Sequence, residues 1–424
     1  MKNTKLVAKD TVWIGGSDRR LALFENLFPL PNGVSYNSYV VLDEKITLFD
    51  TADVSVADQY LENLHSVLGE KKPDYLVVLH MEPDHCSLLQ TVLNQYPETT
   101  VVSSMQTFKF ISQFFQELKI ENQQIVKEGD TLCTGAHTFH FVAAPMVHWP
   151  EVLLAYDDAD KALFSADAFG TFGALEGGIF ADQYDFEAHY LDDARRYYAN
   201  IVGKYGAQVQ AVLKKAAGLE IEEILPLHGP VWRENLGWFL EKYQTWSSYA
   251  PETDDILVVY GSLYGHTASA AESFASVLEE KSGRHVVVYD ASKTDVSYLI
   301  AEVWRCSKVV LFCPTYNGGM YPSISRFIED MKALAVQNRT FALAENGTWA
   351  PVTAKLMRKE LETLKNCSIL DTTLTIRSAL STADEAALND FADAVANASN
   401  DIFTSNPRVP ELSESPGTLF TSSA

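Results

Sequence analysis

Apolar positions in the first 250 residues follow two periods, one typical of short strands and one typical of amphipathic helices. Alternating or continuous apolar runs predict strands at 12–14, 35–42, 45–50, 75–79, 101–103, 130–132, 137–142, 152–156 and 162–165. A helical spacing of apolar residues predicts helices at 54–68, 87–96, 107–118 and 185–217, and a last one ending near residue 248. This half of the chain should therefore form a mixed α/β domain.

The pattern changes after a polar segment at residues 250–255. Apolar runs and helical segments then alternate regularly, which predicts strands at 256–261, 285–290, 309–314, 340–345 and 368–376. Five strands joined by helical crossovers indicate a doubly wound five-stranded parallel sheet. A final helix is expected at 382–399, and the aperiodic residues that follow should form a tail. We therefore predict domains at 1–250 and 251–400, with a C-terminal tail at 401–424.

Composition narrows the possible partners and the compartment. The 424 residues carry a net charge of −23, which argues against nucleic acid and anionic membranes as partners. No apolar run is long enough to span a bilayer, and the N-terminal segment lacks the apolar core of a signal peptide. The five cysteines are scattered and form no C-x-x-C pair, which fits a reducing compartment and excludes a rubredoxin-type site. We expect a cytoplasmic protein.

A dense group of possible metal ligands follows the strand predicted at 75–79. The sequence His80-Met-Glu82-Pro-Asp84-His85 places two imidazoles and two carboxylates within six residues. Pro83 in its middle predicts an irregular loop rather than a helical turn. A loop at the end of a buried strand can direct several side chains at one point, which indicates a site for more than one metal ion.

Three more candidate ligands lie farther along the chain. His148, Asp167 and His228 each stand where a predicted strand runs into a loop that contains glycine or proline, as His80 does. Single histidines are usually surface or core residues, and we give that interpretation to His65, His137, His140, His189 and His285. Trp149 could line the site and Tyr197 could donate a proton there, but core packing explains each at least as well.

The series from His80 to His228 resembles the ligands of the metallo-β-lactamase-type fold, an αβ/βα sandwich. The carboxylate at Glu82, where that fold often has histidine, and the flavodoxin-like second half together resemble the flavodiiron proteins over residues 1–400. The resemblance implies two iron ions with Asp167 as the bridge, roughly 3.5–4 Å apart. It implies one iron held by His80, Glu82 and His148, and the other held by Asp84, His85 and His228. Some family members lack an imidazole at the position of His85.

The donor types are consistent with iron. Zinc sites favour nitrogen and sulfur donors, whereas mixed imidazole and carboxylate ligation favours redox-active iron. Glu82 is therefore the residue that separates the iron interpretation from a zinc hydrolase.

Three loops at the ends of predicted parallel strands form a candidate flavin site. The first loop is rich in hydroxyl and amide donors at the start of a helix, which is an anion site. It lacks both the P-loop lysine and the G-x-G-x-x-G pattern, so FMN fits better than a nucleoside triphosphate or a dinucleotide. The candidate residues are Ser262, Leu263, Tyr264, Gly265, His266, Thr267; Pro314, Thr315, Tyr316, Asn317, Gly318, Gly319; and Glu345, Asn346, Gly347, Thr348, Trp349.

The resemblance implies reduction of O2 to water, of NO to N2O, or of both, with electrons passing through FMN. It also implies an external donor such as rubredoxin or a flavin reductase, and a head-to-tail homodimer or a dimer of dimers. Two other classes remain open: a zinc hydrolase with a flavodoxin-like regulatory domain, and an electron-transfer or redox-sensing protein without gas reductase activity.

Overall fold

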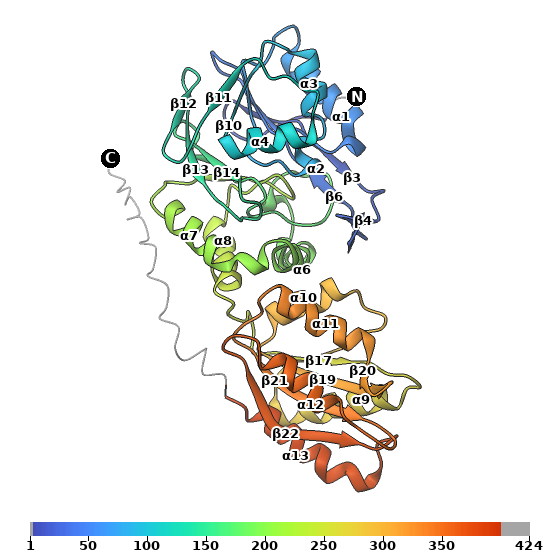
Figure 1. Cartoon of the computed structure of the whole chain (residues 1–424). Coiled ribbons are helices and arrows are strands. Elements are labelled where there is room, and N and C mark those ends of the chain that lie inside the picture. The colour runs from blue at the N-terminus through green and yellow to red at the C-terminus, as the bar shows by residue number, and fades with distance from the viewer. Residues whose placement is uncertain (1–2, 400–424) are drawn as a thin grey trace, which may run out of the picture.

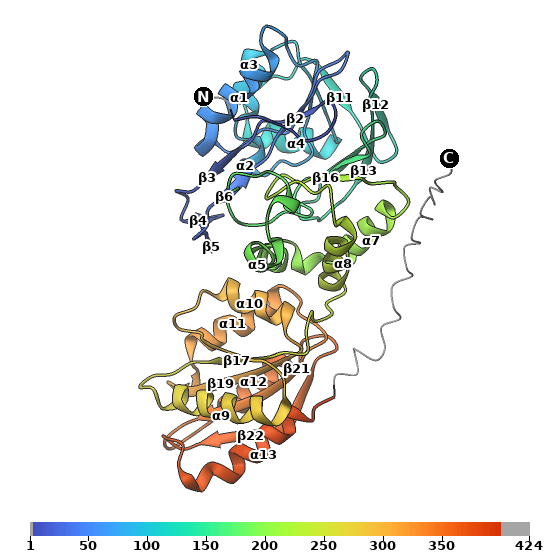
Figure 2. The ribbon, with the colours of Figure 1, turned by 180° about the vertical axis from the view of Figure 1, so that it is seen from behind.

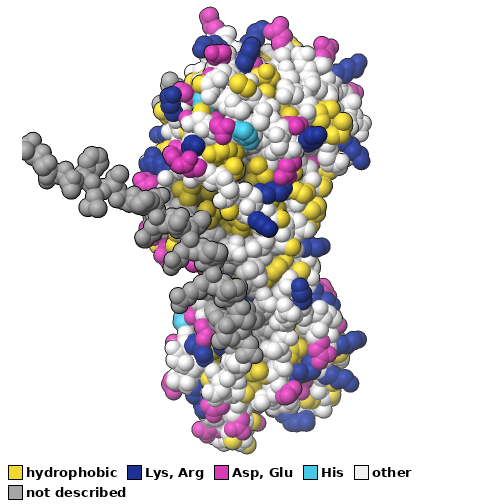
Figure 3. Space-filling view, turned by 90° about the vertical axis from the view of Figure 1, so that its left-hand side faces the viewer, with side chains coloured by type: hydrophobic (Ala, Val, Ile, Leu, Met, Phe, Trp, Pro, Cys, Tyr) yellow, Lys and Arg dark blue, Asp and Glu magenta, His cyan; other side chains and the backbone are white. Residues whose placement is uncertain are grey.

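The chain forms two lobes stacked along one long axis (Figures 1 and 2). The computed structural model describes residues 3–399, so the predicted tail at 401–424 lies outside the described residues. The mixed α/β architecture agrees with the sequence prediction. Among the described helices, none combines the length and apolar character needed to cross a membrane. On the face seen in Figure 3, acidic and basic side chains are interspersed.

The first lobe contains two large sheets that enclose an aromatic core. The seven-stranded sheet runs in the order β1 (Lys5–Leu6), β2 (Thr11–Trp13), β7 (Tyr39–Val41), β8 (Thr47–Phe49), β9 (Tyr75–Val77), β10 (Thr100–Ser103) and β11 (Gln123–Ile125). The five-stranded sheet runs β12 (Thr131–Cys133), β13 (Thr138–Ala143), β14 (Leu153–Asp157), β15 (Ala162–Phe164) and β16 (Glu223–Leu225). Phe49 of the first sheet stacks on Phe164 of the second, with ring centroids 3.9 Å apart.

Two short two-stranded sheets complete the strand pairing of this lobe. They pair β3 (Gly16–Asp18) with β6 (Val34–Tyr36), and β4 (Leu23–Phe24) with β5 (Phe28–Pro29). The strand predicted at 35–42 is therefore divided into β6 and β7. The break falls at buried Asn37, whose side chain donates to Pro226 O and Gly229 O, both at 2.8 Å.

The helices of the first lobe are shorter than their apolar periodicity predicted. They are α1 (Ala57–Leu68), α2 (Pro83–Cys86), α3 (Leu89–Gln95), α4 (Met105–Phe114), α5 (Phe186–His189), α6 (Leu191–Tyr197), α7 (Gly206–Ala216) and α8 (Leu236–Ser247). The helical region predicted at 185–217 is helical in the structure but divided into α5, α6 and α7, because a π turn and a 3-10 turn separate α6 from α7. Close packing explains the glycine that begins α7: a Cβ atom at Gly206 would lie 2.4 Å from Ser247 O.

The second lobe is the doubly wound sheet that the sequence predicts. Its five parallel strands run in the order β18 (Val286–Asp290), β17 (Ile256–Tyr260), β19 (Lys308–Tyr316), β21 (Thr340–Asn346) and β22 (Ser368–Ile376). A short strand, β20 (Gly319–Met320), folds back on the end of β19. The helices are α9 (His266–Ser282), α10 (Val296–Arg305), α11 (Pro322–Ala333), α12 (Thr353–Leu361) and α13 (Glu385–Ala396). The switch point of this strand order, where ligands bind in such sheets, lies between β17 and β19.

Buried arginines join the two lobes. The guanidinium of Arg196 lies between the rings of Phe172 and Tyr298, at 4.6 and 4.1 Å from their centroids. It donates to Ser297 Oγ at 3.2 Å and to Pro29 O. Arg195 pairs with Glu252 in the connecting segment. The domain boundary at residue 250 stays a prediction.

Candidate functional site

The segment His80–His85 leaves the end of β9 and is held by Asp50. Asp50 is buried, and its Oδ1 atom accepts from the backbone N–H groups of Leu79 at 2.8 Å and His80 at 3.3 Å. The prediction of an irregular loop here was wrong in part, because Pro83 begins the short helix α2. Proline suits the first position of a helix, where its missing N–H is not needed. This turn presents Asp84 and His85 from the same side as Glu82.

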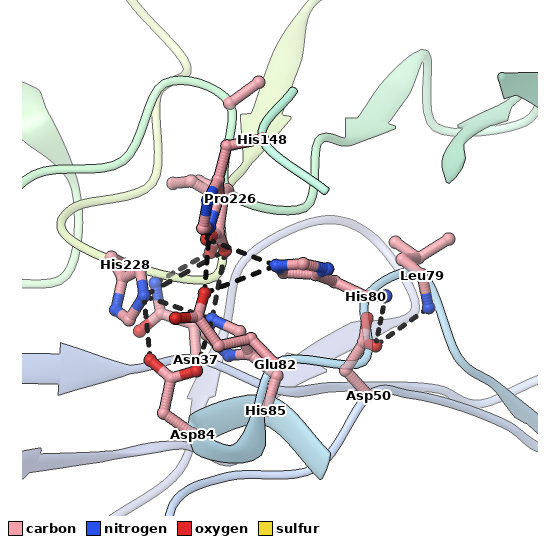
Figure 4. A network of polar contacts seen from close by, with 12 residues as sticks. Asn37, Asp50, Leu79, His80, Glu82, Asp84, His85, His148, Pro226 and His228 are labelled. Atoms are coloured by element: carbon pink, nitrogen blue, oxygen red, sulfur yellow. Dashed lines mark hydrogen bonds and ion pairs between the residues drawn. The ribbon is translucent and has the colours of Figure 1, made fainter. Parts of the chain in front are cut away.

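The first four-residue group brings together side chains from distant segments (Figure 4). His148 Nε2 lies 2.9 Å from Glu82 Oε2 and 3.1 Å from Asp167 Oδ2. His80 Nε2 lies 3.4 Å from the same Glu82 oxygen. Each of the four residues directs one ligand atom to within 4.8 Å of the others, and all four are buried. This group is the first predicted iron site together with the predicted bridge.

The second group consists of Asp84, His85 and His228. His228 Nε2 lies 3.1 Å from His85 Nε2 and 3.2 Å from Asp84 Oδ2. Asp167 faces both groups with different oxygens, because its Oδ1 atom lies 3.0 Å from His85 Nε2. All seven predicted ligands therefore converge, and Asp167 occupies the position between the two groups.

Hydrogen bonds outside the cluster orient two of the imidazoles. His80 Nδ1 donates to Glu151 Oε1 at 2.8 Å, and the same oxygen accepts from Met81 N at 2.9 Å. His228 Nδ1 donates to Ser35 O at 2.8 Å. Such bonds leave each Nε2 atom free to bind a metal. Sequence reasoning missed Glu151; its place three residues after His148 was the only available signal.

The cluster has the properties expected of a metal site. Several of its buried atoms that face the other ligands have no hydrogen-bond partner among the described residues: His80 Nε2, Asp84 Oδ1, Asp84 Oδ2 and Asp167 Oδ1. Leaving buried polar atoms unpaired is costly, whereas metal ions would satisfy them. The mixture of imidazoles and carboxylates suits iron better than zinc. The residues present therefore fit a di-iron centre.

The electrostatics support the same conclusion. Burial alone would lower the pKa of His148, but the carboxylates of Asp167 and Glu82 raise it to about 9. Burial would raise the pKa of Asp167, but His85 and His80 hold that pKa well below its ordinary value. His148 therefore carries a positive charge when no metal is bound, and a bound cation would replace that charge with release of a proton.

Aromatic rings and one further carboxylate surround the cluster. Trp149 and Phe24 lie edge-on to His80 and His228, with ring centroids 5.3 and 5.5 Å apart. The ring of Tyr197 is 5.5 Å from that of His228, and its buried hydroxyl has no partner among the described residues. Glu25, missed by sequence reasoning, lies near Glu82 at the tip of the β4–β5 hairpin and is exposed to solvent on one side. Partial desolvation of its carboxyl and repulsion from Glu82 raise its pKa above the ordinary value.

The three predicted flavin loops surround a cavity of about 540 Å³ in the second lobe. This volume lies in the range of small-molecule sites. Residues of all three loops line it: Leu263, Tyr264, His266, Thr267, Pro314, Thr315, Tyr316, Asn317, Gly318, Asn346, Gly347, Thr348 and Trp349. Ala350, Val352 and Ser378 also line it and were not predicted. None of these described lining residues is acidic, although the chain is strongly acidic, so the cavity fits a phosphate ester such as FMN.

Four predicted flavin residues support the cavity without lining it: Ser262, Gly265, Gly319 and Glu345. Ser262 Oγ accepts from Gly265 N at 3.1 Å and Ala268 N at 3.3 Å, which shapes the first loop. Gly265 precedes α9 with a φ of 94°, a conformation that glycine adopts most easily. Glu345 accepts from Ala354 N at 3.0 Å and so anchors the third loop to α12.

Family models match both lobes of the chain. A model described as ODP family beta lactamase matches residues 34–229, and the Flavodoxin model matches residues 258–365. These two matches contain, respectively, the seven predicted metal ligands and the three flavin loops.

Similarity to individual proteins extends over both lobes together. An anaerobic nitric oxide reductase flavorubredoxin of Escherichia coli is 30% identical over 81% of this chain and 72% of its own length. The solved structure of rubredoxin oxygen:oxidoreductase from Desulfovibrio gigas has a TM-score of 0.88 and 27% identity, covering 95% of this chain and all of that one. The flavodiiron protein of Giardia intestinalis has a TM-score of 0.87 and 25% identity, covering 93% and 96%. With both cofactor sites in place, the chain belongs to the flavodiiron proteins, oxidoreductases that use FMN and a di-iron centre.

Proposed function

We propose that this protein reduces O2 to water at the cluster around Asp167, with electrons delivered through FMN. The convergence of four Nε2 atoms and three carboxylates on two adjacent groups carries this proposal. O2 is favoured over NO because the similarity to rubredoxin oxygen:oxidoreductase covers that chain completely. Reduction of NO to N2O is the second candidate function, and the 30% sequence identity with the nitric oxide reductase flavorubredoxin favours it.

The seven predicted ligands would hold the two irons. His80, Glu82 and His148 belong to one site, and Asp84, His85 and His228 belong to the other. Asp167 would contribute to both sites, because its two oxygens face different groups. When bound, the two irons supply gas binding and electron transfer, and FMN supplies the electrons that they consume.

The other residues of the site control protons and water. Glu151 and the carbonyl of Ser35 fix the orientation of two imidazoles. Trp149 and Phe24 present apolar surface to the ligands, which limits the access of water. Reduction of O2 to water consumes protons, and the Tyr197 hydroxyl is a buried donor without another partner among the described residues.

The flavin cavity and the assembly complete the proposal. The start of α9 would receive the FMN phosphate, and the aromatic residues Tyr316 and Trp349 would cover the flavin ring. We propose a head-to-tail homodimer, alone or paired into a tetramer, that places the FMN of one subunit beside the iron site of the other. An external reductant such as rubredoxin or a flavin reductase would reload the flavin.

The decisive experiment compares the two gases directly. The protein is loaded with iron and FMN, reduced without oxygen, and mixed in parallel with O2 and with NO while the initial rates are recorded. Faster consumption of O2, with water rather than hydrogen peroxide as the product, is the expected result. Faster consumption of NO would assign the second candidate function instead.

Elemental analysis separates these functions from the remaining classes. Two irons and one FMN per chain are expected, whereas zinc without iron would indicate a hydrolase. In Asp167→Asn the consumption of both gases should be lost. Unchanged turnover in that variant would indicate an electron-transfer protein whose cluster does not react with the gas.

A further inference from the structure

A second group of imidazole and carboxylate side chains lies at the opposite end of the first lobe. It contains His137 before β13, Asp157 at the end of β14, Asp160 in the turn before β15, and Asp10 before β2. His148 precedes β14 and Asp167 follows β15, so the turn between these strands faces away from the predicted iron ligands. The five residues of β14 separate the end of the lobe that carries the predicted iron ligands from the end that carries this turn by roughly 15 Å.

His137 is held in the manner of a metal-binding histidine. Its side chain is buried, and Nδ1 donates to Asp157 Oδ2 at 2.7 Å. Asp157 is itself fixed, because its Oδ1 atom accepts from Ala159 N at 3.1 Å. A carboxylate on one ring nitrogen typically orients the other toward a metal. That other nitrogen, Nε2, lies 3.5 Å from Asp10 Oδ2, a separation that suits two ligands of one ion.

Two carboxylate oxygens at this end of the lobe, one of them on Asp160 and one on the neighbouring Glu223, have no hydrogen-bond partner among the described residues. These atoms, Asp160 Oδ2 and Glu223 Oε2, are both buried. Burial and repulsion from Asp157 raise the pKa of Asp160, and burial and repulsion from Asp160 raise the pKa of Glu223 to about 7. Arg233, whose charge lowers the pKa of Glu223, already binds both oxygens of Asp182. A cation bound by Asp160 would satisfy its unpaired oxygen and relieve this repulsion.

We propose that His137, Asp160 and Asp10 bind one divalent ion of the zinc class, with Asp157 as the residue that positions His137. His137, Asp157 and Asp160 offer ligand atoms within 4.8 Å of one another. An imidazole ligand favours Zn²⁺ over Ca²⁺ or Mg²⁺, which prefer oxygen ligands alone. Asp10 precedes a strand of the seven-stranded sheet and the other ligands belong to the five-stranded sheet, so the ion would cross-link the two sheets. This site is separate from the proposed gas reductase site and does not depend on it.

The test counts zinc and iron in the same sample. Holoprotein carrying iron and FMN is dialysed against Zn²⁺, and both metals are measured per chain by mass spectrometry. The variant Asp160→Asn removes a proposed zinc ligand. It breaks no hydrogen bond at the Oδ2 atom, because that atom has no hydrogen-bond partner among the described residues. Its matched control is Asp158→Asn, because Asp158 lies in the same turn but is exposed and pairs with His140 at 2.5 Å.

We expect one zinc per chain, beyond an unchanged iron content, in the wild type and in Asp158→Asn. Affinity for Zn²⁺ should fall at least about tenfold in Asp160→Asn. Equal zinc uptake by the wild type and Asp160→Asn would overturn the proposal, as would zinc uptake matched by loss of iron, or no uptake by the wild type.

Thermal unfolding gives a second measurement that does not depend on iron. Added Zn²⁺ should raise the Tm of the wild type and of Asp158→Asn, because a ligand that binds only the folded state stabilises it. The same addition should raise the Tm of Asp160→Asn by clearly less, because its weaker affinity for Zn²⁺ reduces the stabilisation at the same zinc concentration. Without added zinc, Asp160→Asn should be at least as stable as the wild type, since a repelled carboxylate has been removed. An equal Zn²⁺-induced shift in all three proteins would contradict the assigned ligands.

Discussion

Two carboxylates outside the ligand set hold the first ligand in place. Asp50 binds the backbone of His80, and Glu151 binds its ring through Nδ1. The seven predicted ligands were recognisable from the sequence because their residue types and order form a series. Glu151 and Glu25 were not, because each reaches the cluster only through the folding of a separate segment. Sequence pattern therefore identifies ligands more readily than the residues that orient them.

Removing Glu151 should weaken metal binding without removing a ligand. In Glu151→Ala, His80 loses its orienting partner, and we expect iron affinity to fall about 10- to 100-fold. In Glu151→Gln the amide oxygen can still accept from Nδ1, so most of the affinity should return. Iron remaining after a chelator challenge measures both effects.

The matched control for this prediction is Glu98→Ala. Glu98 is exposed, and its side chain pairs with Lys72 in a surface ion pair at 3.0 Å. Its removal should leave the iron content unchanged. Equal iron retention in Glu151→Ala and Glu98→Ala would show that His80 needs no orienting carboxylate.

Two adjacent tyrosines allow the role of one hydroxyl to be isolated. Tyr197 and Tyr198 are both buried, and both hydroxyls lack partners among the described residues. Only Tyr197 lies beside a ligand, whereas Tyr198 packs on Tyr243 and Trp246. Replacing either by phenylalanine should stabilise the fold by up to about 1–3 kcal/mol, because an unsatisfied buried hydroxyl is removed.

Only Tyr197→Phe should slow gas reduction, by about tenfold or more, if its hydroxyl supplies a proton or hydrogen bond. Stopped-flow rates with each gas, at matched iron content, measure the difference between the two variants. Equal rates in Tyr197→Phe and Tyr198→Phe would assign Tyr197 a packing role alone.

At the scale of secondary-structure elements, the second lobe was predicted more closely than the first. Strands of a parallel sheet are buried on both faces, so β17, β19 and β21 appear as continuous apolar runs. In the first lobe, the break at Asn37 depends on bonds to Pro226 and Gly229, which are far away in sequence. The helical turn at Pro83 was missed because proline was interpreted as a helix breaker, although it is favourable at the first helical position.

Glycines at the two ends of α9 allow the role of the first flavin loop to be tested by substitution. Gly265 precedes the helix and Gly283 follows it; both have positive φ, and a Cβ atom at either would meet nothing within 4 Å. Alanine at either position should therefore cost about 1 kcal/mol through backbone strain alone. Only Gly265→Ala also alters the loop beside the cavity, so it alone should weaken FMN binding.

Fluorescence titration of the flavin-free proteins with FMN measures this difference. Chemical denaturation of both variants supplies the stability comparison. If Gly283→Ala weakened FMN binding as much as Gly265→Ala, the effect would come from general destabilisation of the helix and not from the loop.

At the scale of the whole molecule, the metal cluster and the flavin cavity lie in different lobes (Figure 1). Tyr264 and Trp349 line the cavity yet remain 91% and 87% exposed. Rings exposed to this extent at a ligand site suggest that a further surface covers them. A second subunit in the head-to-tail arrangement would provide such a surface, and this explanation makes a prediction about electron transfer.

Mixing two inactive variants should restore activity if electrons cross between subunits. Asp167→Asn removes the bridging ligand but leaves the flavin cavity intact. His266→Glu places a carboxylate at the start of α9, where it would repel the FMN phosphate but leave the metal cluster intact. In a head-to-tail dimer that contains one chain of each variant, the flavin bound by the Asp167→Asn chain faces the iron site of the His266→Glu chain. Random exchange of subunits should then restore roughly a quarter of the wild-type activity per chain.

Transfer within one chain predicts no recovery, because neither variant holds both working sites. The control mixes wild type with the double variant Asp167→Asn/His266→Glu, whose mixed dimers contain no working pair if transfer crosses between subunits. Native mass spectrometry verifies that exchange has occurred in both mixtures. An inactive mixture of fully exchanged single variants would place electron transfer within one chain, and full activity of a monomer would rule out the dimer as the working unit.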